Sequence, residues 1–112
     1  MKPEAPRIDM PSSAKVNEVI MIRTKLRHPM ETGWRKTSEG ETVERNRLTR
    51  FSCHFDGKEV VTANFGSGVS QDPYFLFYAK ITKAGIFTFR WEGDNGQVYT
   101  ESLPITIEQV TA

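Results

Sequence analysis

Hydrophobic and polar residues alternate with a period of two along most of the chain, which is the pattern of half-buried β-strands. The clearest case is the segment 86–92. There Phe87, Phe89 and Trp91 share one face, while polar residues occupy the other. The exception to the alternation is a short extended tail at the start of the chain. No stretch has the 3.6-residue period of a helix, so the pattern predicts an all-β protein.

We expect six or seven short strands, separated by turn residues about ten positions apart. The expected strands are 16–26, 51–55 with a return strand 58–65, 74–82, 86–92 as the partner of 74–82, and a last strand or pair of segments over 98–111. This series predicts an immunoglobulin-like antiparallel β-sandwich, with a small barrel as the second possibility.

Two of these strands carry more detail in their alternation. In 16–26, one face holds the apolar residues Val16, Ile20, Ile22 and Leu26, although Val19 and Met21 blur the pattern. In 51–55, Phe51, Cys53 and Phe55 alternate with Ser52 and His54, which predicts that the first three face the core.

Turn residues separate the expected strands. Asp56-Gly57 is a strong two-residue hairpin signal, and 93–96 contains an Asn-Gly pair that tolerates a tight turn. Pro104 is expected at an edge or a bulge, because proline cannot donate a ladder hydrogen bond.

The chain divides into an extended N-terminal segment, 1–14, and a single domain, 15–112. Three prolines in the segment forbid helix. Within the domain, 29–47 is rich in charge and almost without apolar residues, which predicts a long exposed loop or a protruding hairpin.

The composition fits one soluble domain and excludes several function classes. A length of 112 residues leaves room for one hydrophobic core. Fifteen Lys and Arg against fourteen Asp and Glu give a net charge of +1, which argues against a nucleic-acid binder. No apolar run approaches the roughly 18 residues of a membrane span. The first dozen residues lack the apolar region of a secretory signal, so on this evidence alone we expect a cytoplasmic or already processed chain.

The single cysteine offers the most direct route to catalysis. Cys53 shares the predicted core face, and His54 points the other way, so we expect a small buried hydrophobe rather than a nucleophile with a neighbouring base. Copper ligation of the cupredoxin kind needs a His or Met at the spacing of a cupredoxin ligand loop after the cysteine, and that spacing is missing. A reactive or partner-linked thiol at Cys53 remains the alternative.

The segment 74–78 is apolar at both parities. One face can enter the core, and the other then presents Tyr74, Leu76 and Tyr78. Such an apolar outer face predicts a contact with another chain, unless the loop 29–47 with Trp34 folds over it.

The charge is unevenly distributed along the chain. The segment 23–50 has eight basic and four acidic residues, whereas 84–112 has one basic and four acidic. A surface polarised in this way can orient an acidic partner, although it can also be an inert surface.

Several segments together resemble a known family. They are His28-Pro29-Met30-Glu31-Thr32-Gly33, the run 72–78, Phe87-Thr88-Phe89-Arg90-Trp91 and Asp94-Asn95-Gly96. With them the chain resembles the SoxZ family, the small subunits of the SoxYZ thiosulfate-oxidation carrier, from about residue 7 to residue 107.

The resemblance implies an immunoglobulin-like sandwich with a non-catalytic role. We also expect no cofactor and no bound metal. The resemblance further implies a heterodimer with SoxY, whose flexible C-terminal arm carries the sulfur intermediate on a cysteine, and transient contacts with other Sox enzymes. The terminal residues 108–112 hold no cysteine, so we expect the arm on the partner. The resemblance also implies a periplasmic location, reached together with a signal-bearing partner.

The candidate site residues are therefore partner contacts. Tyr74, Leu76 and Tyr78 are the candidates for the SoxY interface. A second docking surface for enzymes is expected on the loop after the first long strand, with the candidates His28, Met30, Glu31 and Trp34.

Two alternatives belong to other function classes. One is a sulfur-transfer or thiol-redox protein that uses Cys53. The other is an adhesion or carbohydrate-binding sandwich that uses Trp34 and the tyrosines against sugars.

Overall fold

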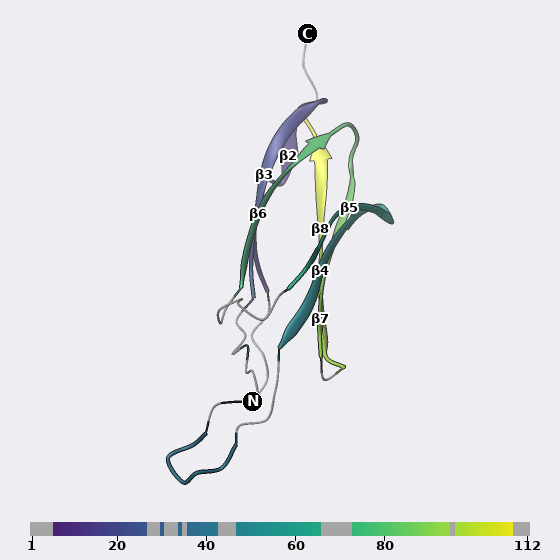
Figure 1. Cartoon of the computed structure of the whole chain (residues 1–112). Coiled ribbons are helices and arrows are strands. Elements are labelled where there is room, and N and C mark those ends of the chain that lie inside the picture. The colour runs from purple at the N-terminus through teal and green to yellow at the C-terminus, as the bar shows by residue number, and fades with distance from the viewer. Residues whose placement is uncertain are drawn as a thin grey trace.

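The computed structural model describes residues 6–26, 30, 34, 36–42, 47–65, 73–94 and 96–108. Over these residues the protein is all-β, with no helix. Its strands form two sheets that pack face to face, as the two layers of Figure 1 show. The expected immunoglobulin-like sandwich is confirmed, and the two separate sheets rule out the small barrel.

The described residues contain eight strands. They are β1 (Arg7–Asp9), β2 (Ser13–Ala14), β3 (Glu18–Lys25), β4 (Leu48–Phe55), β5 (Lys58–Asn64), β6 (Tyr74–Ile81), β7 (Gly85–Gly93) and β8 (Val98–Ile107). Strands β3 to β8 correspond to the expected ones, and β1 and β2 lie in the N-terminal segment.

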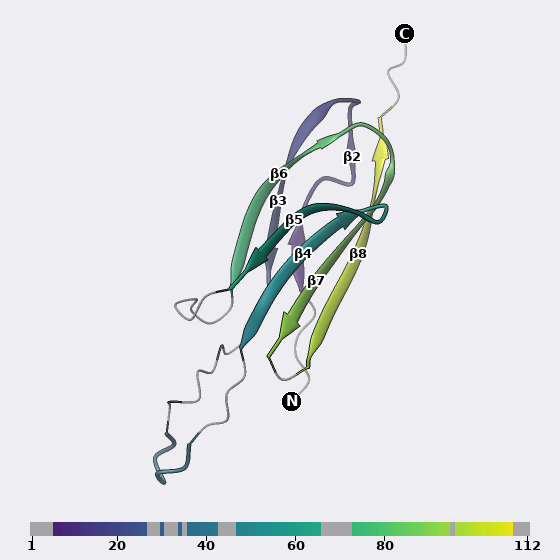
Figure 2. The same cartoon turned by 45° about the vertical axis from the view of Figure 1, so that its right-hand side comes forward.

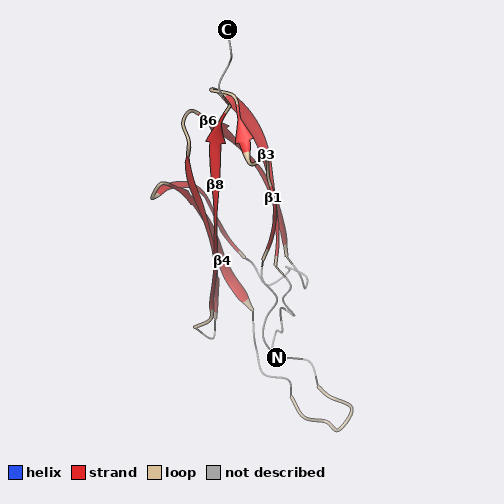
Figure 3. Cartoon of the chain, turned by 180° about the vertical axis from the view of Figure 1, so that it is seen from behind, coloured by secondary structure: helices blue, strands red, loops and turns tan. Residues whose placement is uncertain are grey.

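The smaller sheet has the order β1-β3-β6, and the larger has the order β2-β8-β7-β4-β5. Figure 2 shows β5, β4, β7 and β8 side by side, and Figure 3 shows β1 next to β3 in the other layer. Strand β1 is antiparallel to β3, and β2 is parallel to β8. The N-terminal segment thus adds one strand to each sheet.

One expected pairing is wrong. Strand β6 pairs with β3, whereas β7 pairs with β4 and β8. The residues between β6 and β7, 82–84, carry the chain from one sheet to the other instead of forming a hairpin. This short connection therefore joins two consecutive strands, β6 and β7, that belong to different sheets.

The inner faces of the two sheets form one core. At its centre Phe51 packs against Trp91 with ring centroids 5.0 Å apart, and it stacks on Phe75 of the opposite sheet at 4.9 Å. Burying an aromatic side chain of this size stabilises the fold by about 2–3 kcal/mol. The faces predicted from Phe87, Phe89 and Trp91 are confirmed, since all three are buried.

The expected place of Val16 on the apolar face of the strand 16–26 is wrong. Val16 is 58% exposed, because Asn17 has a φ of 68° and the strand begins only at Glu18. Ser52 lies on the outer face, as the alternation predicts, and it is buried there at 5% exposure between Thr62 and Arg90 of the flanking strands.

The hairpin at Asp56-Gly57 is confirmed. Both residues have positive φ, 48° and 84°, which is the requirement of the tight turn whose twist matches the flanking strands. Asp56 also holds the start of β7: its Oδ1 accepts a hydrogen bond from the Ile86 amide at 2.8 Å. A Cβ at Gly85 would lie 2.5 Å from Cζ of Phe55, so this close approach requires glycine.

Strand β8 ends at Ile107, and the expected continuation over 109–111 lies outside the described residues. Pro104 pairs with Ile86 on the β7 side. On its other side β2 reaches only Thr106 and Ile107, so no described strand pairs with β8 there. The predicted edge position of Pro104 is confirmed.

Candidate functional site

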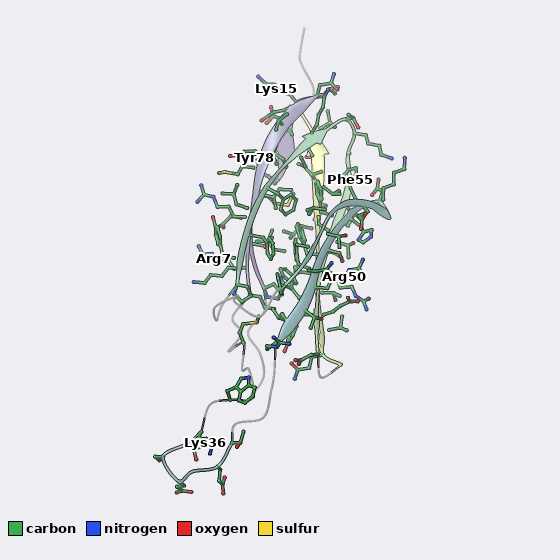
Figure 4. The ribbon with its side chains drawn as sticks, viewed as in Figure 1. Arg7, Lys15, Lys36, Arg50, Phe55 and Tyr78 are labelled. Atoms are coloured by element: carbon green, nitrogen blue, oxygen red, sulfur yellow. The ribbon has the colours of Figure 1, made fainter. Side chains whose placement is uncertain are left out.

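The outer face of the smaller sheet carries large apolar side chains. Tyr74, Leu76 and Tyr78 of β6 are 55%, 42% and 65% exposed, as the alternation predicted. Their neighbours in sequence, Phe75 and Phe77, turn inward and pack against the core. Figure 4 shows Tyr78 on β6.

Strand β3 extends this apolar surface. Residues that face each other across an antiparallel pair lie on the same side of the sheet. Met21 is opposite Tyr78, and Val19, which is 59% exposed, is opposite Lys80. We define the outer-face patch as the apolar residues Val19, Met21, Tyr74, Leu76 and Tyr78.

Basic side chains surround the outer-face patch. Arg23 is opposite Leu76, and Lys25 is opposite Tyr74. Across the other edge of β3, Arg7 is opposite Lys25, and its guanidinium lies 3.9 Å from Asp9. The patch is thus apolar at its centre and mainly cationic at its rim. This arrangement is typical of protein interfaces, whose apolar centre excludes water while rim charges orient the partner.

Val19 and Met21 were absent from the sequence-based candidates for this face. The signal was present, because these two residues blur the alternation of 16–26 just as Tyr74, Leu76 and Tyr78 blur that of 74–78. Their meaning depends on β3 and β6 being neighbours, and the expected pairing of 74–82 with 86–92 concealed this.

The loop 29–47 was the competing cover for Tyr74, Leu76 and Tyr78. In its described part Lys36 and Thr42 form an isolated antiparallel bridge, and residues 36–42 are all exposed. This confirms the protruding hairpin for those residues. Figure 1 shows the hairpin extending beyond the end of the sandwich, and Trp34 is 87% exposed. The described part of the loop therefore leaves the outer-face patch open.

The second expected docking surface, on the loop after the first long strand, is only partly confirmed by the structure. Met30 is buried, at 7% exposure, and its Sδ lies 3.3 Å from the Leu48 amide that donates to it. Its side chain belongs to the core and is not available at the surface, which corrects its expected place beside exposed Trp34. His28 and Glu31 lie outside the described residues.

The base of the loop is tied to the end of the sandwich. The Arg47 amide donates to Asp94 Oδ1 at 3.1 Å, and Arg47 Nε lies 3.5 Å from Oδ2. The Asp94 amide in turn donates to the Arg47 carbonyl at 2.9 Å. Both side chains are largely buried, so this contact fixes where the loop returns to β4.

Cys53 is fully buried, as predicted. Desolvation raises the pKa of its thiol from 9.0 to about 12. The nucleophilic form of cysteine is the thiolate, so at neutral pH this side chain stays protonated and acts as a small apolar group.

The described residues contain neither a metal-binding cluster nor a membrane-spanning helix. Among them, no three His, Cys, Asp or Glu side chains are grouped so that they could hold a metal ion. In the same part of the chain, no helix is long and apolar enough to cross a membrane.

Comparison with known proteins supports both the fold and the family resemblance. A family model described as "Sulphur oxidation protein SoxZ" matches residues 8–104. No curated protein sequence matches the chain significantly.

Several solved structures share the fold. A superoxide reductase (neelaredoxin) from Ignicoccus hospitalis has a TM-score of 0.74 at 17% identity, covering 95% of this chain and 82% of that one. The sulfur carrier protein SoxY from Chlorobium limicola f thiosulfatophilum has a TM-score of 0.65 at 11% identity, covering 94% and 80%. A putative superoxide reductase from Thermotoga maritima has a TM-score of 0.73 at 18% identity, covering 96% and 89%. At such identities the likeness concerns the fold alone.

Proposed function

The chain belongs to the SoxZ family, and from that premise we propose that it is the non-catalytic subunit of a SoxYZ-type sulfur carrier. It has a role in sulfur oxidation. In the proposed complex it pairs with a SoxY protein, and the partner's C-terminal arm carries the sulfur on its cysteine. The Sox enzymes then act on the arm while this subunit holds its root.

The outer-face patch is the observation that carries the proposal. Its apolar side chains lie in water in the isolated chain, and burying apolar surface gains about 25 cal/mol per Å². Tyr74 and Tyr78 are suited to the centre of an interface, because their rings bury large areas while the hydroxyls keep a polar contact. A partner that covers the patch gains this free energy.

The basic rim supports a partner with an acidic surface. Arg23 and Lys25 stand beside the patch, and their charges can steer association and set the register of docking. Lys80 extends the same charge to the other end of β6. Trp34 on the loop 29–47 is our candidate for the transient contacts with the processing enzymes, because its side chain is exposed.

The burial of Cys53 supports a scaffolding role over thiol-based sulfur transfer. A thiol that stays protonated and lies out of reach of solvent is a poor nucleophile. For the location we propose the periplasm, where a SoxY partner would bring this subunit with it.

Intact mass spectrometry of the complex isolated from its host tests this proposal. Under native conditions we expect a mass equal to this chain plus one SoxY-like chain. Under denaturing conditions without reductant, we expect sulfur adducts on the partner and an unmodified mass for this chain. Isolation of this chain alone from the intact host complex, or a reductant-sensitive adduct on Cys53, would refute the proposal.

A further inference from the structure

The two sheets leave an open side where their outermost strands, β6 and β5, run along the same edge of the sandwich. Between β6 and the β4–β5 turn lies a groove of about 370 Å³. Its apolar lining comes from Phe55, Ala79, Ile81 and Phe87. In Figure 4, Phe55 and Tyr78 mark the two sides of this groove.

The backbone of β6 points toward this open side at every second residue. The Leu26 amide donates to the Pro73 carbonyl, which fixes where the bonded pairs of β3 and β6 lie. Bonded and non-bonded pairs alternate in an antiparallel ladder. Phe77 and Ala79 therefore bond to β3, whereas the amide and carbonyl groups of Tyr78 and Lys80 point away from it.

Those outward groups have no strand beside them. β6 is the last strand of its sheet, and among the described residues none pairs with its free edge. An edge of this kind is a template for an added strand. In an added strand, alternate side chains would point into the gap between the sheets, toward the apolar groove.

The charges at the rim indicate what the added strand carries. Lys83 lies 3.6 Å from Asp56, so these two charges are paired, whereas Glu59 accepts a hydrogen bond from Thr62 and keeps its negative charge. Lys58 and Lys80 also border the groove, and neither forms an ion pair with a described residue. The rim thus has two unpaired lysines against one carboxylate, and this positive excess favours an acidic ligand.

The same charges argue against a second copy of this chain at the edge. Pairing two β6 strands around Tyr78 and Lys80 would bring like charges close together, and like charges across a strand pair are destabilising. Lysines at sheet edges discourage this kind of self-association.

We propose that the free edge of β6 and the groove beside it bind an extended acidic peptide segment of another protein. The segment adds a strand to β6 and bonds to the backbone of Tyr78 and Lys80. One of its apolar side chains enters the groove, and its carboxylates lie near Lys58 and Lys80. This binding mode uses the edge of β6, so it does not depend on the function proposed for the outer-face patch.

Amide hydrogen exchange by NMR on the full chain tests this inference. The probe is a synthetic six-residue peptide, capped at both ends, in which valine or phenylalanine alternates with glutamate. We expect the amides of Tyr78 and Lys80 to exchange rapidly in the free chain and at least about tenfold more slowly with saturating peptide, since they gain hydrogen bonds. The amides of Phe77 and Ala79 are already bonded to β3 and serve as internal controls.

Two variants test the groove and the charge separately. Val60→Trp fills the groove from its exposed side and should abolish peptide binding, while Val98→Trp on β8, in the same sheet but away from the groove, should not. Lys58→Glu should weaken binding about tenfold, and the matched charge reversal Lys15→Glu should change it by less than about twofold.

Three results would overturn the inference. One is unchanged exchange at Tyr78 and Lys80 when the peptide is present at millimolar concentration. Another is equal weakening by Lys58→Glu and Lys15→Glu. A third is protection of the same two amides on raising the concentration of the chain alone, which would assign the edge to a second copy.

Discussion

The outer faces of the two sheets are built from strands with the same kind of alternation, yet their chemistry differs. The smaller sheet presents the outer-face patch with its basic rim. The larger sheet presents short hydroxyl side chains and paired charges, such as Thr88 with Ser102 at 3.4 Å and Arg90 with Glu92 at 3.0 Å. Its exposed apolar residues Ile86 and Val98 stand apart on it and need no partner to explain them.

The difference separates what the fold requires from what the surface adds. Both sheets need apolar inner faces, and the stacking of Phe51 on Phe75 across the layers meets that need. An outer face can be polar without cost to the core, as the larger sheet demonstrates. We therefore attribute the apolar side chains on the outside of β3 and β6 to the proposed partner, and we expect the two faces to respond differently to the same change.

Replacing Leu76 with aspartate should have the largest effect. The new carboxylate would lie opposite Arg23 in the folded subunit, which tolerates it, but the proposed interface would have to bury it. We expect binding to a SoxY partner to weaken by at least about 100-fold, measured by calorimetry on purified subunits. Thr100→Asp on the larger sheet is the matched control and should bind normally. Equal losses for both variants would remove the distinction between the faces.

Raising the pH should weaken the fold through Cys53. The folded-state pKa of about 12 lies above the unfolded value of 9.0, so its contribution to stability is complete below pH 9 and is lost as the pH rises toward 12. We expect the free energy of unfolding to fall in this window by up to about 1.4 kcal/mol per pH unit more in the natural chain than in Cys53→Ala. Urea denaturation at pH 8 and pH 10.5 measures the difference. Parallel pH profiles would mean that the thiol is not buried in the way described.

Reversing the rim charges should weaken binding to SoxY less than placing a carboxylate in the outer-face patch at Leu76. The double variant Arg23→Glu and Lys25→Glu should slow association with SoxY about tenfold at low salt, with little effect on dissociation. Stopped-flow measurements over a range of salt concentrations follow this rate. The same reversal at Arg50 and Arg90 on the larger sheet should leave the rate within about twofold. A rate that responds to neither pair would remove electrostatic steering from the account.

Cys53→Ser should have the smallest effect on thiosulfate oxidation. A buried hydroxyl in place of the thiol should lower the free energy of unfolding by about 1–3 kcal/mol, because the hydroxyl gives up its hydrogen bonds to water when the chain folds. Thiosulfate oxidation in a reconstituted Sox system should nevertheless proceed at the rate of the natural chain, once the heterodimer is shown to be assembled. Loss of thiosulfate oxidation in a fully assembled heterodimer would indicate that Cys53 takes part in the reaction.

The sequence alone predicts most strands of this sandwich, because their alternation repeats over several residues and ends at clear turn signals. Phe87, Phe89 and Trp91 are an example, and so is the Asp56-Gly57 hairpin. The pairing of strands was harder. It depends on whether the chain stays in one sheet or crosses at residues 82–84, and no local signal distinguishes these possibilities.

The candidate site was predicted in part for the same reason. Tyr74, Leu76 and Tyr78 could be assigned to an outer face from parity alone, and their exposure confirms this. Val19 joins them only through the β3–β6 register. Met30 lies in a polar segment, yet it turns back into the core to meet Leu48, a tertiary contact that composition does not encode. The groove beside β6 likewise exists only once both sheets are assembled.

Hydroxyl-radical footprinting of the isolated chain and of its complex with SoxY tests the central claim most directly. Tyr74 and Tyr78 are exposed in the chain by itself and should be oxidised readily. In the complex their modification should fall about tenfold or more, while Ile86 and Val98 on the larger sheet keep their reactivity. Tyrosines that stay reactive in a stoichiometric complex would contradict the claim that a partner covers this face.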